Sequence, residues 1–552
     1  MSKHRTHILR ALRIIVAGLL FTGTTLLFLD FTGVTHKWLG WMAKIQFLPA
    51  VMSLNVAVII LLVGLTFLCG RVYCSIICPL GIMQDIVSWF RGRFKKKNRF
   101  RFSYRKENKW LRYGFLALFI AAMVAGVHAI VALLAPYSTY GRIVNNLFAP
   151  VYKWGNNLLA WISAKVGSYA FYPAEVWIGS LPVFIAAVAM FVLICILAYT
   201  GGRTWCNNIC PVGTVLGLVS RYSLFGPVID SGKCRGCKLC GKQCKSSCID
   251  MEHHQIDYSR CVDCMDCLDI CNEGAIQYGF RYGKKTTKNK NVQQTTGLTT
   301  GQITEQTTER MTEQTTGKTT GTGQMTGTSA GETGNGAGGS AAGGNGRRAF
   351  VISSALVLAS AALKAQEQKV SKRLAPAGPH SRPGREISPV PAGAGSQKDF
   401  HARCTACQLC VGACPNKVLT PSSSLEHFMQ PEMTFERGWC RNDCNRCSQV
   451  CPSGAIRPVS IEQKSSIQVG YAVADHERCV VVTDSVRCGN CAKHCPVGAI
   501  NMVPLNADDP KSLRVPSVDE QTCIGCGACE HLCPARPLAA IHVEGLDVHR
   551  TI

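Results

Sequence analysis

The chain has 552 residues, of which 47% are apolar and 31 are cysteine. This length excludes the small disulfide-rich scaffolds, which are short secreted domains. The formal net charge of +25 does not indicate a nucleic-acid partner, because it counts every cysteine as neutral and because the remaining basic excess is concentrated in residues 91–112, beside apolar segments.

Four apolar segments in the first part of the chain are long enough to cross a bilayer, which takes about 20 residues of helix. They are residues 12–31, 49–69, 111–135 and 181–200. Lysine and arginine gather before the first segment and in the loop after the second, so the positive-inside rule places both ends of this unit in the cytoplasm. We therefore expect an all-α, four-helix membrane bundle over residues 1–225.

The membrane half contains an internal repeat at an offset of 132 residues. Gly-Arg followed by Cys-x3-Cys-Pro occurs at residues 70–79 and again at 202–211, each time at the cytoplasmic end of a predicted span. Free cysteines often only pack as small apolar residues, but repeated halves of membrane proteins often form a site at their interface. Duplication of the arginine together with the cysteines favours a redox or metal site. Its residues are Cys74, Cys78, Cys206 and Cys210.

One histidine, His128, lies inside the third predicted span. Polar side chains at that depth are functional candidates, and an imidazole there could contact a quinone headgroup. A hydrogen bond that only stabilises the structure is the more common role of a lone histidine.

Two runs of cysteine follow the membrane half and predict a cytoplasmic ferredoxin domain with two [4Fe–4S] clusters over residues 226–283. Both runs have the spacing C-x2-C-x2-C-x3-C, in which the fourth cysteine binds the neighbouring cluster. We therefore pair the first three cysteines of each run with the last cysteine of the other. Cys248 is surplus and could replace Cys244. The runs are Cys234-Cys237-Cys240-Cys244 and Cys261-Cys264-Cys267-Cys271.

Residues 284–346 consist of Thr, Gly, Gln and Glu in near-repeats and contain almost no large apolar side chain, which predicts a disordered linker. Arg347 and Arg348 then precede a short run rich in Ala and Ser, a combination that resembles a twin-arginine export signal. We interpret residues 347–366 as a signal-like fifth membrane segment, with a soluble amphipathic helix as the alternative. A Pro/Gly-rich spacer follows over residues 367–398.

Residues 399–552 contain four more cysteine runs, each ending in Cys-Pro, and predict a ferredoxin domain with four [4Fe–4S] clusters. Two runs have a wider first gap, which indicates inserted loops. The sequence leaves the pairing open between first with second and third with fourth, or first with fourth and second with third. The runs are Cys404-Cys407-Cys410-Cys414, Cys440-Cys444-Cys447-Cys451, Cys479-Cys488-Cys491-Cys495 and Cys523-Cys526-Cys529-Cys533.

The six runs together fit iron–sulfur clusters better than zinc. Zinc sites favour paired Cys-x2-Cys knuckles or histidine partners, and none of the runs is closed by a histidine. Soft thiolates at ferredoxin spacing suit [4Fe–4S] cubanes, and six runs supply ligands for six of them. We expect two small α+β ferredoxin-like domains attached to a membrane bundle, in a protein that transfers single electrons.

The spans, the doubled Cys-x3-Cys-Pro motif and the first cysteine domain resemble the NapH/MauN family of membrane ferredoxin-type proteins. The twin arginine and the last four runs resemble the NapG/MauM family of periplasmic four-cluster ferredoxins. The chain looks like a natural fusion of the two. The resemblance implies a multi-pass protein of the bacterial inner membrane, with its first ferredoxin domain in the cytoplasm and its second in the periplasm. It also implies transfer of electrons from membrane quinol to a periplasmic reductase or carrier.

These features predict membrane lipid, the quinone pool and a periplasmic redox protein as partners. A quinol dehydrogenase component is the leading interpretation of the function. A membrane polyferredoxin that helps to assemble a respiratory metalloenzyme is the first alternative. The second keeps both ferredoxin domains in the cytoplasm, where they would supply a soluble reductase.

Overall fold

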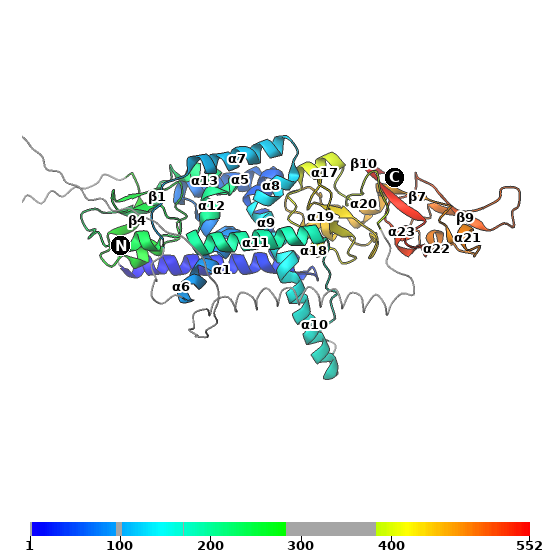
Figure 1. The fold of residues 1–552 in the computed structure, drawn as a ribbon, viewed down its shortest axis with the longest axis horizontal. Helices are drawn as coiled ribbons and strands as arrows, with labels where there is room; N and C mark the ends of the chain where they lie inside the picture. The colour runs from blue at the N-terminus through cyan, green and yellow to red at the C-terminus, as the bar shows by residue number, and fades with distance from the viewer. Residues whose placement is uncertain (1–2, 95–101, 169, 283–381) are drawn as a thin grey trace, which may run out of the picture. The chain divides into compact units, whose positions relative to one another are not determined.

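The computed structural model describes residues 3–94, 102–168, 170–282 and 382–552 (Figure 1). These residues belong to a single compact unit. The predicted linker, residues 284–346, and the signal-like segment, residues 347–366, lie outside the described residues.

Two of the described helices are long and apolar enough to cross a membrane, namely α1 (Lys3–Leu29) and α11 (Leu181–Gly201). Neither contains an acidic residue, and α11 ends where Gly202 takes a positive φ of 67°. A span of about 20 helical residues rises by about 30 Å, the thickness of the hydrocarbon core. These two helices correspond to the first and fourth predicted spans.

The other two predicted spans are interrupted. The second is divided between α4 (Phe47–Met52) and α5 (Val56–Cys69), where the Asn55 side chain accepts a hydrogen bond from the Val58 amide and so caps the start of α5. The third is divided between α7 (Lys109–Val124) and α8 (His128–Leu134), where the chain turns at Gly126 with a φ of 73°. The continuous four-helix bundle therefore stays a prediction.

The internal repeat is visible in the fold, because α6 (Pro79–Phe94) and α13 (Pro211–Ser220) each begin at the proline of a Cys-x3-Cys-Pro motif. Proline is favoured in the first helical turn, where its missing N–H is not needed. The remaining elements of this half are α2 (Val34–Leu39), α3 (Trp41–Lys44), η1 (Tyr73–Ile77), α9 (Pro136–Ile143), η2 (Val144–Phe148), α10 (Ala149–Lys165) and α12 (Thr204–Asn208).

The first ferredoxin-type unit is closed by the antiparallel pair β1 (Phe225–Ile229) and β4 (Ile276–Phe280). Its short helices α14 (Leu239–Gln243) and α15 (Asp266–Ile270) occupy equivalent places in the two cysteine runs. Each follows a residue with positive φ, which turns the chain so that three successive cysteines can face one centre. The strands β2 (Ile249–Asp250) and β3 (Gln255–Ile256) connect the two halves.

The second ferredoxin-type unit has a short helix in each of its four cysteine runs, and α18 (Leu409–Ala413) and α23 (Ala528–Leu532) again follow a residue with positive φ. In it β5 (Leu419–Pro421) pairs with β6 (Pro431–Met433), β8 (Ile500–Pro504) with β9 (Arg514–Val518), and β7 (Ile467–Ala474) with β10 (Ile541–Thr551), all antiparallel. Its helices are α17 (Gln397–Arg403), α18 (Leu409–Ala413), α19 (Arg446–Val450), α20 (Ile461–Ser466), α21 (Val480–Thr483), α22 (Asn490–Lys493) and α23 (Ala528–Leu532).

The folded second unit also includes part of the predicted spacer. Val390 and Ala394 are buried, and the Arg385 guanidinium donates to a Glu530 carboxylate oxygen at 2.5 Å and to the Val543 carbonyl at 2.8 Å. Residues 382–395 therefore form part of this unit.

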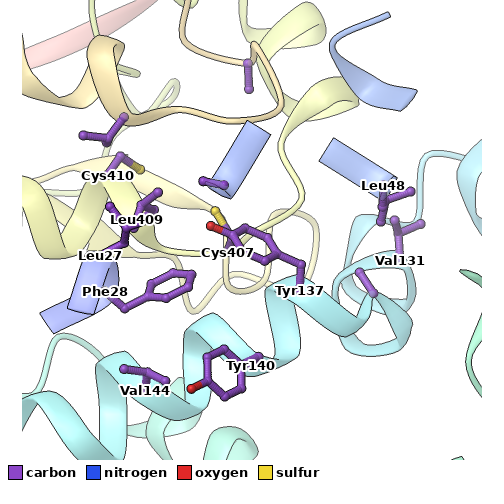
Figure 2. Close-up of a cluster of buried hydrophobic side chains, with 14 of the residues drawn as sticks. Leu27, Phe28, Leu48, Val131, Tyr137, Tyr140, Val144, Cys407, Leu409 and Cys410 are labelled. Atoms are coloured by element: carbon purple, nitrogen blue, oxygen red, sulfur yellow. The ribbon is translucent and has the colours of Figure 1, made fainter. Parts of the chain in front are cut away.

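The two ferredoxin-type units contact opposite ends of α1. Near its beginning, Arg10 donates to Asp266 at 2.9 Å and to Asp269 at 3.0 Å, both in the first unit. Near its end, Phe28 packs with Tyr137 in the same buried cluster as Cys407 of the second unit (Figure 2). A helical rise of about 1.5 Å per residue separates Arg10 from Phe28 by about 27 Å.

Candidate iron–sulfur sites

The first unit brings its predicted ligands together in two groups of four. Cys240 has Cys234, Cys237 and Cys271 as its electrostatic neighbours, and Cys267 has Cys261, Cys264 and Cys244. A cavity is lined by the four cysteines of the second group. In each group the fourth cysteine comes from the other run, as the spacing predicts.

Cys248 stands beside one of these groups. Its side chain is buried, its Sγ lies 3.5 Å from that of Cys244, and it lines the same cavity. Either thiol can therefore act as the fourth ligand of the group.

The second unit also forms groups of four, and here the structure selects between the two pairings that the sequence left open. The first run exchanges its last cysteine with the second run, and the third run exchanges its last cysteine with the fourth. The groups are Cys404, Cys407, Cys410 with Cys451; Cys440, Cys444, Cys447 with Cys414; Cys523, Cys526, Cys529 with Cys495; and Cys479, Cys488, Cys491 with Cys533.

These four groups are arranged as a row. Cys407, in the first group, packs beside Tyr137 of the membrane half (Figure 2). The second group adjoins the first through the exchanged cysteines. The Cys440 amide donates to the Cys526 carbonyl at 2.9 Å, which joins the second group to the third. The group containing Cys479 and Cys533 therefore completes the row at the end remote from Tyr137.

The chemistry of these thiols suits a bound cluster. Burial raises the pKa of Cys407 to about 12, of Cys526 to about 12 and of Cys491 to about 11. Such thiols are protonated on their own at neutral pH, whereas a bound metal centre makes the thiolate the stable form. Within the described residues, no three His, Cys, Asp or Glu side chains converge as ligands of a single ion would. A cubane instead takes one cysteine for each of its four irons.

The four cysteines of the internal repeat form a separate buried group in the membrane half, here called the repeat quartet. Its members are Cys74, Cys78, Cys206 and Cys210, and their thiols are electrostatic neighbours. The two copies of the repeat hold each other, because Arg71 donates to the Cys206 carbonyl at 3.1 Å and Arg203 donates to the Cys74 carbonyl at 2.5 Å.

The two arginines differ in their charge partners. Arg203 makes two hydrogen bonds to the Asp85 carboxylate, at 2.9 and 2.7 Å, and Arg13 donates to the same group at 2.6 Å. The Arg71 guanidinium is fully buried and has no carboxylate within 4.0 Å among the described residues. The sulfur of Cys74 lies 3.7 Å from its Nη2 atom. The buried carboxyl of Asp263 is an electrostatic neighbour of Arg71 at longer range. Anionic sulfur beside Arg71 would add counter-charge in direct contact with the guanidinium.

Comparison with known proteins decides the family. The N-terminal half matches a 4Fe-4S binding domain over residues 52–97 and 183–229, and the C-terminal half matches a 4Fe-4S dicluster domain over residues 403–455 and 486–536. The methylamine utilization ferredoxin-type protein MauM of Methylophilus methylotrophus is 34% identical over 163 residues, which cover 28% of this chain and 70% of MauM. The chain belongs to the family of ferredoxin-type iron–sulfur proteins.

The other half of the chain has its own relatives in this family. The ferredoxin-type protein NapH of Haemophilus influenzae is 25% identical over 244 residues, which cover 43% of this chain and 71% of NapH. MauN of Paracoccus denitrificans is 30% identical over 190 residues, which cover 34% of this chain and 52% of MauN. No solved structure matches the chain. The ferredoxin-type protein described here thus joins a NapH/MauN-like part to a MauM-like part.

Sequence reasoning singled out His128 but did not find two histidines that lie close to it. The rings of His401 and His427 stack with their centroids 3.5 Å apart, and His427 is an electrostatic neighbour of His128. The only signal in the sequence is that His401 precedes the first run of the second unit by three residues. Nothing in the sequence connects it to His128.

Proposed function

We propose that this ferredoxin-type protein is a membrane-anchored conduit that carries six [4Fe–4S] clusters and passes electrons from the quinol pool, through the row of clusters in its second unit, to a periplasmic reductase or electron carrier. The observation that carries this proposal is the row of four cysteine groups in the second unit. The row begins against the membrane half and ends at a remote face. Clusters in such a row would carry electrons from the membrane half to that remote face.

Contacts at the two ends of α1 support opposite locations for the two units. The Arg10 end of α1 carries the basic residues that the positive-inside rule places in the cytoplasm, and the first unit contacts this end. The second unit contacts the end near Phe28, about 27 Å away along the helix. The proposed protein lies in the bacterial inner membrane, with its second unit in the periplasm.

Electrons would leave the protein at the remote end of the row. Val482 and Val486 are exposed and lie in the loop between Cys479 and Cys488, which belong to the last group. Apolar side chains around a redox centre form the kind of small, weak interface that electron-transfer partners use. We assign the docking of the periplasmic partner to this face.

The repeat quartet is proposed as an additional metal or redox centre. Its four buried thiols come from both copies of the repeat, and the sulfur of Cys74 lies 3.7 Å from Nη2 of the buried Arg71 guanidinium. Negative charge on the sulfur atoms would be stabilised by this guanidinium. Thiolate ligands of a metal centre are deprotonated and would supply this charge.

Anaerobic purification followed by iron and sulfide analysis tests the cluster count. The proposal predicts at least about 24 iron atoms and about 24 sulfide ions per chain, because each cubane contains four of each. Iron beyond this number would belong to the repeat quartet. Accessibility of the second unit to protease from outside intact spheroplasts tests its location. Far fewer than six cubanes, or full protection of the second unit, contradicts the proposal.

A strain that lacks the protein separates the conduit from the assembly factor. A conduit predicts that the periplasmic partner enzyme is complete but receives no electrons from quinol. A partner enzyme without its own cofactors indicates the assembly function instead.

A further inference from the structure

A cavity of about 860 Å³ lies between the α7–α8 turn and the second ferredoxin-type unit. Its size is within the range of small-molecule sites. One wall contains Met123, Val124 and His128 from the membrane half, and the other contains His401 and His427. The cavity is thus shared between the apolar part of the protein and the part that contains the row of cysteine groups.

The polar wall of the cavity has a ring nitrogen available to a ligand. The Nδ1 atom of His427 is buried and has no hydrogen-bond partner within the described residues. Its stacking partner His401 is held in place, because its ring nitrogens lie 2.6 Å from Oε1 of Gln430 and 3.1 Å from Oε1 of Gln397. Buried polar atoms normally have partners, so the free nitrogen of His427 marks a position for a ligand hydroxyl.

The other features of the cavity suit an amphiphilic redox ligand. Val124 and Val127, at the end of α7, are exposed to the surroundings of the helix and offer an apolar approach. Cys404, a member of the first group of the row, also lines the cavity. A ligand whose apolar tail lies along α7 would therefore place its headgroup beside both the histidines and the first cysteine group.

We propose that this cavity is the site of quinol oxidation, with the quinol headgroup bound between His427 and His128 and with His401 as a positioning residue. This inference rests on the proposed function, which requires a quinol donor but does not locate its site.

The reaction at this site balances as follows. Oxidation of one quinol to quinone breaks two O–H bonds and releases two protons and two electrons. Stacked rings 3.5 Å apart cannot both hold a positive charge, so the His401–His427 pair accepts one proton and His128 accepts the other. A [4Fe–4S] cluster held by Cys404, Cys407, Cys410 and Cys451 would supply a one-electron acceptor beside the cavity, and the two electrons of the quinol would leave through it in succession.

Electrostatics favour an uncharged His401 before quinol binds. Burial, together with the nearby His427 and His128, lowers the pKa of His401 to about 4, so this ring is uncharged at neutral pH. The charged groups that line the same cavity are Arg385, Glu386, Lys398, Glu426, Glu432 and Asp547.

Binding of a quinol-site inhibitor tests the cavity independently of electron transfer. Full-length protein in lipid nanodiscs is titrated with 2-heptyl-4-hydroxyquinoline N-oxide, whose fluorescence is quenched on binding. We expect His427→Gln and His128→Gln to weaken binding by about tenfold each, as expected for loss of one hydrogen bond to a ligand. The control is His476→Gln, because His476 bonds the Pro516 carbonyl outside the cavity at 2.8 Å.

Cluster reduction by a water-soluble menaquinol analogue completes the test. Dithionite must reduce wild type and all variants to the same extent, which shows that each folds and carries its clusters. The inference predicts that wild type and His476→Gln are reduced rapidly by the quinol, and that the two cavity variants are reduced at least about tenfold more slowly.

Two contrary results are distinguishable. A wild-type protein that dithionite reduces but quinol does not overturns the quinol donor of the proposed function, and the site with it. A wild-type protein that quinol does reduce, with cavity variants that bind the inhibitor and react as wild type does, overturns only the location of the site.

Discussion

The two ferredoxin-type units contact the membrane half through different chemistry. The first unit is held largely by charged groups, since Asp266 accepts from Arg10 at 2.9 Å and the Lys245 ammonium lies 3.9 Å from Asp85 of the membrane half. The second unit is held by an apolar cluster, in which Phe28 and Tyr137 surround the segment that contains Cys407 (Figure 2). Half-exposed ion pairs of Glu175 with Lys417 and Arg437 also hold the second unit. Charged contacts can hold a unit in place while water still reaches its cysteine groups. An apolar contact excludes water from the cysteine group nearest to it.

The cysteine groups differ in exposure within the first unit. Cys237 is exposed, whereas Cys244 and Cys261 of the other group are buried, as is Cys407 of the second unit. Solvent exposure is one of the properties that set a cluster's reduction potential. Under the proposed function, electrons would enter from the membrane at the second unit, where the nearest cysteine group is buried against Tyr137.

The largest effect is expected from removing the cluster ligand at the apolar contact. Cys407→Ala should lower the iron content by about four atoms per chain and abolish reduction of the second unit by quinol, because it removes the first member of the row. Iron analysis measures the iron content, and anaerobic stopped-flow absorbance measures the reduction of the second unit by quinol. Cys237→Ala is the matched control, with the same iron loss but unchanged reduction by quinol. Equal loss of quinol reduction in both variants contradicts separate entry points.

The next effect concerns the buried arginine beside the repeat quartet. Arg71→Met should lower stability by about 3–5 kcal/mol if the sulfur atoms are anionic, because they would lose their buried counter-charge. Thermal unfolding in detergent measures the change, and iron analysis reports loss of a centre. The control is Arg221→Met at an exposed position. Unchanged unfolding and iron in Arg71→Met indicates that the quartet only packs.

A smaller effect is expected where a single arginine joins the second unit to the membrane half. The guanidinium of Arg142 is buried and donates to the Ala132 carbonyl at 2.7 Å and the Ala406 carbonyl at 3.3 Å. Arg142→Leu leaves these carbonyls without their donor, at a cost of about 1–3 kcal/mol each. Hydrogen exchange should increase around residues 404–410 and stay unchanged in the first unit. Increased exchange in both units contradicts a local contact.

The smallest effect comes from salt. Partly exposed ion pairs are screened, and Arg10 is 35% exposed, so contacts of Arg10 with Asp266 and Asp269 should weaken by about 0.2–1 kcal/mol at high ionic strength. The apolar contact at Phe28 should not weaken at high ionic strength. Limited proteolysis at low and high salt compares the two units in a Glu175→Gln variant, which lacks the half-exposed ion pairs of the second unit with Lys417 and Arg437. An equal response of both units in this variant would refute the division drawn above.

Local spacing predicted much of the site. The C-x2-C-x2-C-x3-C runs indicated the groups of the first unit, because a short helix and a tight turn within each run decide which thiols face one centre. Pairing in the second unit could not be predicted, since it depends on which runs meet in space, as Cys414 of the first run meets Cys447 of the second. The histidine cavity was beyond reach for the same reason, because His128 and His427 meet only through the interface.

Hydropathy also predicted only part of the structure of the four apolar segments. Hydropathy identified α1 and α11, whose apolar character is continuous. It did not detect the interruptions at Asn55 and Gly126, because averaging over a window hides a single capping side chain or a single left-handed glycine. The predicted signal-like segment stays a prediction.

Freeze-quench electron paramagnetic resonance of the full-length protein in nanodiscs, mixed anaerobically with quinol, tests the central claim most directly. The account predicts signals of reduced [4Fe–4S] clusters within the first turnover, with magnetic coupling between neighbours as the row in the second unit fills. A protein that shows these signals with dithionite but stays silent with quinol would contradict it.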